Sequence, residues 1–166
     1  MPLGLWRGNL VQNGGFERGL ADWLGVTNVD LESSPLCHEG LLAAAMGKPD
    51  NAAPADMFQD VPVAPRHTYK LGFFAAGVET NPGDLVVDVR WIGYAGDIGC
   101  ALAGGPVLVR GDTTGRAASG AWKAVITYTE SAPPGAETAR ICLVKAPGTL
   151  TASYLLVDDV VLVQRD

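Results

Sequence analysis

Apolar and polar residues alternate in short runs along almost the whole chain, and no stretch keeps the 3.6-residue period of an amphipathic helix. The clearest run is 85–92, where every second residue is large and apolar. This two-residue period is that of a β-strand with one buried face. We therefore predict strands at Asn9–Gln12, Trp23–Leu31, Leu41–Met46, Met57–Val63, Tyr69–Ala76, Leu85–Tyr94, Val107–Arg110, Trp122–Thr129, Ala139–Lys145 and Tyr154–Gln164.

Turn-forming residues separate the predicted strands, since the 166 residues include 21 glycines and 11 prolines. The composition of Leu41–Met46 favours helix, but Gly40 and Gly47 bracket this short segment, so we predict a strand. Many short strands with regular turns indicate an all-β sandwich or barrel. The length suits a single domain over residues 1–166.

The alternation also assigns residues of three predicted strands to opposite faces. The apolar set, which we expect in the core, is Tyr69, Leu71, Phe73, Ala75, Leu85, Val87, Val89, Trp91, Ile141 and Leu143. The other side of the same strands carries Lys70, Phe74, Asp88, Arg90 and Arg140. If these strands are neighbours, these side chains form one outer sheet surface with mixed charges and an aromatic ring.

The charge balance argues against two classes of partner. Lysine and arginine number 12, aspartate and glutamate number 18, and the net charge is −6. Nucleic acids and anionic membranes attract a concentrated positive field, so we expect neither as a partner. The longest apolar stretch, Leu41–Met46, is far shorter than the ~20 residues of a membrane span, so we expect no membrane insertion. The first residues show no signal-peptide pattern, so either the protein is made without a signal or this is a secreted module in mature form.

The three cysteines, Cys37, Cys100 and Cys142, are widely spaced and form no Cys-x-x-Cys pair. The histidines, His38 and His67, also lie far apart, so the sequence does not indicate a zinc site. The sequence leaves two arrangements possible: one disulfide with one free thiol, or three unpaired thiols. Strand phase predicts that Cys142 lies partly accessible on an outer sheet face, and we expect an accessible Cys100 in its glycine-rich connection.

Common enzyme motifs are absent, including the Gly-x-Ser-x-Gly elbow, the phosphate-binding loop and His-Glu-x-x-His. Asp158 and Asp159 are paired carboxylates in sequence, but adjacent strand residues point to opposite faces, so we expect them apart. Arg110-Gly111-Asp112 is a tripeptide that some cell-surface receptors recognise, but we interpret it as a strand leaving into a turn. We predict that the chain is not an enzyme.

Several segments follow one another in a distinctive order. They are Asn-Leu-Val-Gln-Asn-Gly-Gly-Phe-Glu at 9–17, Trp23, His-Glu-Gly-Leu-Leu-Ala at 38–43, Phe-Gln-Asp-Val at 58–61, Tyr-Lys-Leu-Gly-Phe-Phe-Ala at 69–75, Trp122, Ala-Pro-Pro-Gly-Ala at 132–136 and Leu-Val-Asp-Asp-Val-Val-Leu at 156–162. This order resembles that of the jelly-roll carbohydrate-binding modules of the galactose-binding-like superfamily, the kind appended to xylanases and glucanases. The resemblance covers residues 9–162 and implies a jelly-roll β-sandwich of two antiparallel sheets.

Modules of this kind hold a buried calcium ion that ties the first strand to the last. The resemblance implies side-chain and backbone oxygen ligands from Gly15, Glu17, Glu39, Leu42 and Asp158. Asp158 is in phase with Val160 and Leu162, which we expect to face the core, and a carboxylate on that face is costly unless it is paired or binds a metal. The alternative is that Asp158 accepts backbone N–H groups and that Glu17 lies on the surface.

The resemblance further implies a non-catalytic carbohydrate-binding or lectin-like module that acts outside the cell or on its surface. A polysaccharide or glycan would bind on the outer concave sheet through Asp88, Arg90, Arg140 and Phe74, with Lys70 and Tyr94 at the edges. Arginine and aspartate would pair in the free state and turn their spare donors and acceptors to sugar hydroxyls. The alternatives are a structural or adhesion module of a cell-surface, spore-coat or phage-tail assembly, and a small hydrolase on the same scaffold.

Overall fold

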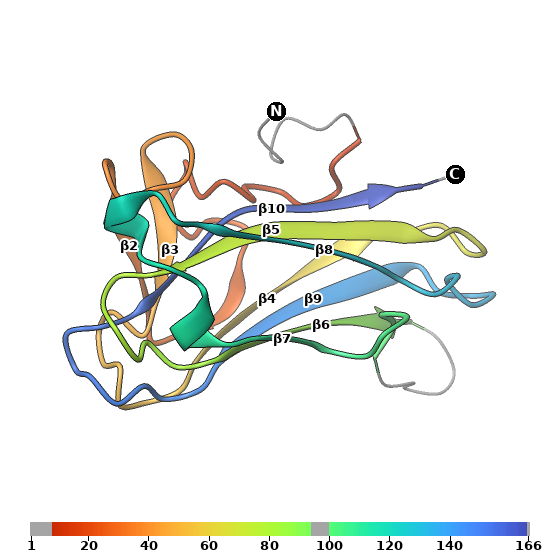
Figure 1. Cartoon of the computed structure of the whole chain (residues 1–166). Coiled ribbons are helices and arrows are strands. Elements are labelled where there is room, and N and C mark those ends of the chain that lie inside the picture. Colours follow the sequence, from red (N-terminus) through yellow and green to blue (C-terminus); the bar gives the residue numbers. More distant parts are fainter. Residues whose placement is uncertain (1–7, 94–99, 166) are drawn as a thin grey trace.

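Two five-stranded antiparallel sheets pack face to face in the computed structural model, which describes residues 8–93 and 100–165 (Figure 1). The first sheet has the order β1 (Leu24–Thr27), β4 (Ala55–Pro62), β9 (Thr138–Lys145), β6 (Leu85–Ile92) and β7 (Val107–Val109). The second sheet has the order β2 (Val29–Ser33), β3 (Leu42–Met46), β10 (Leu155–Gln164), β5 (Tyr69–Gly77) and β8 (Lys123–Tyr128). Two short 3-10 helices, η2 (Gly111–Thr113) and η3 (Ala117–Ser119), lie between β7 and β8. The expected β-sandwich is confirmed, and no described helix is long and apolar enough to cross a membrane.

The predicted strands are confirmed with two exceptions. The segment Trp23–Leu31 divides at Asn28 into β1 and β2, which belong to different sheets. Asn28 has a left-handed φ of 56°, and its side-chain amide bonds the backbone of Asp50 in both directions. A left-handed residue breaks the extended backbone, so the chain crosses from one sheet to the other here. In the described part of the chain, Asn9–Gln12 forms a single β-bridge to β10 before the backbone turns, and is not a strand.

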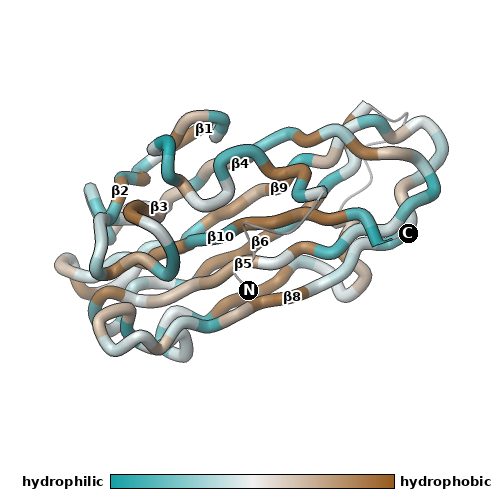
Figure 2. The backbone as a smooth tube through the Cα atoms, turned by 90° about the horizontal axis from the view of Figure 1, so that it is seen from above, coloured by the Kyte–Doolittle hydropathy of each residue, from teal (hydrophilic) through white to brown (hydrophobic). Residues whose placement is uncertain are grey.

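The space between the sheets is filled by the side chains that the alternation predicts. The core residues expected on β5, β6 and β9 are all at most 4% exposed. The alanine-rich β3 is a strand because both of its faces are covered. Ala44 and Met46 join the main core, while Ala45 contacts a smaller cluster around Leu156 on the outer side of the second sheet. Figure 2 shows the hydrophobic stretches concentrated along the strands.

One charged residue, Lys145, lies within this core at the end of β9. It is in phase with the inward-facing Ile141 and Leu143 and is 0% exposed. Its Nζ donates a hydrogen bond to the Ala146 carbonyl at 2.9 Å, and no carboxylate of the described residues forms an ion pair with it. Burial lowers the pKa of Lys145 from 10.5 to about 8, because the ammonium loses its hydration.

We expect Lys145→Met to stabilise the protein at pH 7 by about 1–2 kcal/mol, because an apolar chain of similar length replaces a buried charge without a counter-ion. The pKa of Lys145 is lower in the folded than in the unfolded state, so the cost of burying it is complete below pH 8 and fades toward pH 10.5. Thermal melts should therefore show a gain at pH 7 that shrinks at pH 10. The exposed Lys123→Met is the control, and a lower melting temperature for Lys145→Met at pH 7 would contradict the expectation.

Candidate functional site

A β-bulge in β10 determines where the two adjacent aspartates lie. Asp158 pairs with Phe74 on β5, but the next pair joins Val161 to Gly72, and Asp159 between them has a φ of 52°. The extra residue shifts the phase of the strand. The residues that reach the main core are Leu155, Val157, Val160 and Leu162. The expectation that Asp158 shares the face of Val160 and Leu162 is therefore wrong, and so is the expectation that the two aspartates point apart.

Asp158 is fully buried and accepts three backbone N–H groups. Its Oδ2 accepts from His38 at 3.1 Å and from Glu39 at 3.2 Å, and its Oδ1 accepts from Asp159 at 2.8 Å. Burial, and then the charge of Asp159, raise the pKa of Asp158 to about 8, while the three N–H groups act in the opposite direction. Asp158 thereby holds the connection between β2 and β3 against the outer side of the second sheet.

Asp159 holds the same connection through a side chain. Its Oδ2 lies 2.7 Å from Nδ1 of His38, whose ring stacks on Phe74 with centroids 3.7 Å apart and meets Trp122 edge-on at 5.4 Å. The His38 ring therefore covers one side of Phe74, which is left partly exposed. Phe74 thus offers less open ring surface than the sequence expectation requires.

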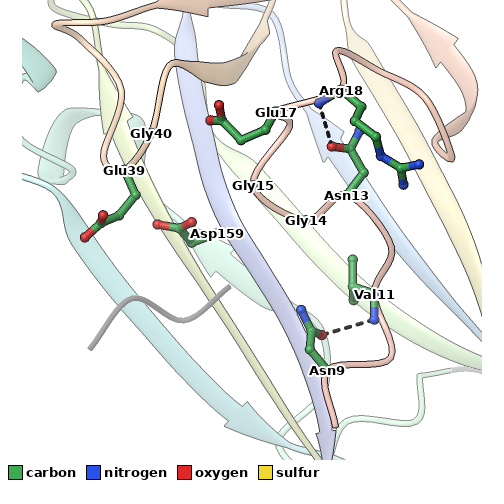
Figure 3. A pocket seen from close by; sticks show the side chains of 10 residues that line it. All are labelled: Asn9, Val11, Asn13, Gly14, Gly15, Glu17, Arg18, Glu39, Gly40 and Asp159. Carbon is green, nitrogen blue, oxygen red and sulfur yellow. Dashed lines mark hydrogen bonds between the residues drawn. The ribbon is translucent and has the colours of Figure 1, made fainter. Parts of the chain in front are cut away.

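A cavity of about 440 Å³ lies beside these contacts, between the N-terminal segment and β10 (Figure 3). Its lining includes Gly15, Glu17, Glu39, Gly40 and Asp159. Both Glu17 carboxylate oxygens accept the Leu41 N–H, at 2.9 and 3.1 Å, and Oε1 also accepts the Leu42 N–H at 3.1 Å. Glu17 therefore holds the end of the β2–β3 connection next to β3, and Asp158 holds the middle of the same connection.

These contacts test how well the predicted calcium ligands fit a metal. Gly15, Glu17 and Glu39 line the cavity, whereas Asp158 and Leu42 do not. The carboxylate oxygens of Asp158 and Glu17 already accept backbone N–H groups, which is the alternative that the sequence left open for Asp158. Over residues 8–93 and 100–165, no three acidic, histidine or cysteine side chains converge to hold a metal. Calcium binding stays a prediction, and any site here needs backbone carbonyls as well.

A second polar group occupies the outer face of the first sheet, where three central strands lie in register. Asp60 on β4, Arg140 on β9 and Arg90 on β6 form one row. The next row holds Phe58 and, across Cys142, Asp88. We call Phe58, Asp60, Asp88, Arg90 and Arg140 the Arg140 lattice.

Ion pairs and one ring contact hold the Arg140 lattice in place. Arg140 donates to both Asp60 oxygens, from Nε at 2.8 Å and from Nη2 at 3.0 Å, and its guanidinium carbon lies 4.3 Å from the centre of the Phe58 ring. Arg90 donates from Nε to Asp88 Oδ2 at 3.1 Å. Arg90, Arg140 and Asp60 are partly exposed and leave donors and acceptors open to solvent, whereas Asp88 is mostly buried and its Oδ1 is out of reach of solvent.

The structure divides the residues that the sequence placed on one surface. Asp88, Arg90 and Arg140 lie together on the first sheet, whereas Lys70 and Phe74 lie on β5 in the second sheet. A single surface containing all of them is therefore wrong, because alternation reports the face of a strand but not the sheet to which it belongs. Tyr94 lies outside the described residues.

Sequence reasoning missed two members of the lattice, Phe58 and Asp60. The signal was present, because Met57 and Val61 alternate with them and face the core. Extending the alternation analysis to β4 would have placed both on the outer face.

The cysteines are all unpaired and half-buried. Cys142 lies on the outer face of the first sheet, as strand phase predicts, within the Arg140 lattice. Burial is the main cause that raises the pKa of its thiol, and Asp88 and Asp60 add to it, while the two arginines oppose it. Burial likewise raises the pKa of the Cys100 thiol, which lies beside Asp88.

An aliphatic row borders the lattice on the same face. Leu108 on β7, Val86 on β6 and Val144 on β9 are cross-strand neighbours. They are 51%, 37% and 45% exposed, respectively. The outer face of the first sheet is therefore charged along one part and apolar along another.

Both sheets pair strands that are far apart in the sequence. No protein-family model matches the sequence, and no curated protein matches it. Solved structures do match, and the chain shares its β-sandwich fold with carbohydrate-binding modules.

Three solved structures illustrate the likeness. "Family 16 Carbohydrate Binding Module-2" superposes with a TM-score of 0.68 at 20% identity, over 93% of this chain and 99% of the other. A family 61 module described in complex with beta-1,4-galactotriose gives 0.62 at 21% identity, over 95% and 99%. The enzymatically active domain of tailspike protein 4 from bacteriophage CBA120 gives 0.66 at 16% identity, over 95% of this chain but only 21% of that one. At these identities the likeness is one of fold.

Proposed function

We propose that this chain is a non-catalytic module that binds a polysaccharide or glycan on the outer face of the first sheet. The observation that carries the proposal is the Arg140 lattice, an ordered set of planar polar side chains beside an aromatic ring. It lies in a fold shared over most of the chain with modules described as carbohydrate-binding. Such a module would act outside the cell or on its surface.

The chemistry of the lattice suits sugar hydroxyls. Guanidinium groups offer several fixed donors and carboxylates offer acceptors, so a diol can bond both members of one ion pair. Since Arg140 already covers the Phe58 ring, stacking contributes little, and we expect a dissociation constant of about 0.1–1 mM.

A non-catalytic role is supported by the placement of the adjacent carboxylates. Asp158 is fully buried, and Asp159, which lines the cavity, is only 4% exposed and is paired with His38. Both are held by the connection between β2 and β3.

Retention in native gels that contain soluble polysaccharides tests the proposal. The panel consists of β-glucan, xylan, galactan, arabinan and mannan, with albumin as the unretained reference. We expect slower migration of this chain in at least one gel. Unretarded migration in every gel would contradict glycan binding.

We further propose a calcium ion near Glu17, supported by the carboxylate-lined cavity that joins the N-terminal segment to β10. A ligand bound only by the folded state raises stability by mass action, so EGTA should lower the melting temperature and Glu17→Gln should reduce that difference. Identical melting temperatures with and without EGTA, together with no calcium by elemental analysis, would contradict calcium binding.

A second candidate function, assembly of this chain with copies of itself, is favoured by the aliphatic row of Leu108, Val86 and Val144. Contiguous exposed apolar side chains are typical of protein contacts. This candidate expects a concentration-dependent mass above the 17.3 kDa monomer in light scattering, lost in Val86→Thr/Val144→Thr. A constant monomer mass in both proteins would rule out self-assembly through the row.

A further inference from the structure

Two recesses lie at the end of the sandwich opposite the described C-terminal residues, among the connections at the left of Figure 1. Their volumes are about 220 and 250 Å³. Asn81 and Asp112 line both recesses. The walls come from the β5–β6 connection, the segment around η2 and the β9–β10 connection. We call the pair the end recess.

The backbone that forms the end recess is tightly packed. A Cβ on Gly111 would lie 2.1 Å from the Gly83 carbonyl oxygen, and one on Gly148 would lie 2.5 Å from the Asn81 carbonyl oxygen. Neither position can accept a larger residue without moving a neighbouring loop. Backbone hydrogen bonds also join the loops, from Ala146 N to Asp84 O at 2.8 Å and from Gly148 N to Asn51 O at 2.7 Å. The shape of the recess is therefore built into the fold.

The charged side chains around the recess are only loosely paired. Arg110 lies 3.9 Å from Asp84, and Arg116 lies 3.9 Å from Glu79. Exposed ion pairs of this length contribute about 0–1 kcal/mol, so a ligand can compete for them at little cost. In the described part of the chain, neither the Asp112 carboxylate nor the Asn81 side-chain amide has a hydrogen-bond partner.

The tripeptide Arg110-Gly111-Asp112 belongs to this recess. The structure places it in a turn, as the sequence predicts, with η2 starting at Gly111. The Gly111 N–H donates to Asp84 Oδ1 at 2.9 Å, which fixes the turn against the neighbouring loop. Arg110 and Asp112 thereby line the same recess.

We propose that the end recess binds a single neutral sugar residue, such as the terminal residue of a glycan. Acidic and basic groups are nearly balanced there, which favours a neutral ligand over an ion. Carboxylates, guanidinium groups and an amide supply both donors and acceptors, as a ring of hydroxyls requires. Each recess is smaller than the ~300–1,000 Å³ pockets of drug-sized ligands, so it suits one ring rather than a chain.

This site is separate from the Arg140 lattice and does not depend on it. The lattice is on the outer face of the first sheet, whereas the end recess is built from connections between strands. Either site can bind a ligand when the other does not.

Amide chemical shifts of the ¹⁵N-labelled chain, titrated with glucose, galactose, mannose, xylose and arabinose, test the proposal. With at least one sugar, we expect saturable shifts at Asn81, Gly83, Gly111 and Asp112 and in the β9–β10 connection. Asp112→Ala should weaken the binding at least tenfold. The side chain is exposed and unbonded, so the variant should keep the spectrum of the folded protein.

A matched variant separates this site from the rest of the surface. Glu137→Ala removes an exposed carboxylate at the opposite end of β9. It should bind the monosaccharide as the parent chain does. The proposal is overturned if no sugar shifts these amides, or if Asp112→Ala binds as tightly as the parent. Polysaccharide binding by the lattice is tested separately in the gels. A negative result in one of the two experiments therefore does not decide the other.

Discussion

We expect Asp158→Ala to lower the free energy of unfolding by about 3–5 kcal/mol and the melting temperature by about 10 °C. The carboxylate is fully buried and accepts N–H groups from His38, Glu39 and Asp159. Alanine leaves these donors without an acceptor in a region that water does not reach, and each such donor costs about 1–3 kcal/mol. Thermal and urea unfolding, followed by circular dichroism, measure the change.

Asp30→Ala is the control, because Asp30 is exposed on β2 of the same sheet and bonds only the N–H of the adjacent Leu31. Its effect should stay within about 0.5 kcal/mol. Equal stability of the Asp158→Ala variant and the parent would show that the β2–β3 connection is not held as described. If EGTA lowers the stability of the parent but not of Asp158→Ala, the carboxylate also supports a bound metal.

The second large effect is on glycan binding. We expect Arg140→Ala and Arg90→Ala each to weaken retention on the bound polysaccharide at least tenfold, because each removes a guanidinium group from the centre of the lattice. Stability should change by only about 0–1 kcal/mol, since the ion pairs with Asp60 and Asp88 are partly exposed. Affinity gel electrophoresis over a series of polysaccharide concentrations gives the apparent dissociation constants.

Lys48→Ala is the matched control, because Lys48 is also paired with a carboxylate, Glu32, but lies outside the first sheet. Its retention should equal that of the parent. Full retention by Arg90→Ala and Arg140→Ala would move the site away from the lattice.

The strands were predictable because their period is local. Leu85, Val87, Val89 and Trp91 are buried and their neighbours are more exposed, as two-residue alternation requires. Even β3 followed from the glycines that bracket it, although its alanines favour helix.

The bulge in β10 was not predictable in the same way. Asp158 and Asp159 lie inside the strongly apolar strand β10, and nothing in the alternation marks the extra residue between Asp158 and Val161. Asp159 has a left-handed backbone, and its side chain pairs with His38 in the β2–β3 connection. Both features depend on contacts between segments that are far apart in the sequence. The face of the paired carboxylates was therefore assigned incorrectly.

The candidate ligand face was predictable only in part. Register places Asp88, Arg90 and Arg140 together, but membership of a sheet depends on which strands pair across long sequence separations. Lys70 and Phe74 have the right phase and lie in the other sheet. Phe74 is also covered by His38, a contact between residues distant in sequence.

The most direct test of the account is a crystal structure of the chain with an oligosaccharide from the polysaccharide that retains it. The account predicts sugar density over β4, β9 and β6, with hydroxyls within hydrogen-bond distance of Arg140 and Asp60. Sugar bound only elsewhere on the molecule, with an empty and accessible lattice, would contradict the assignment of the glycan to this face.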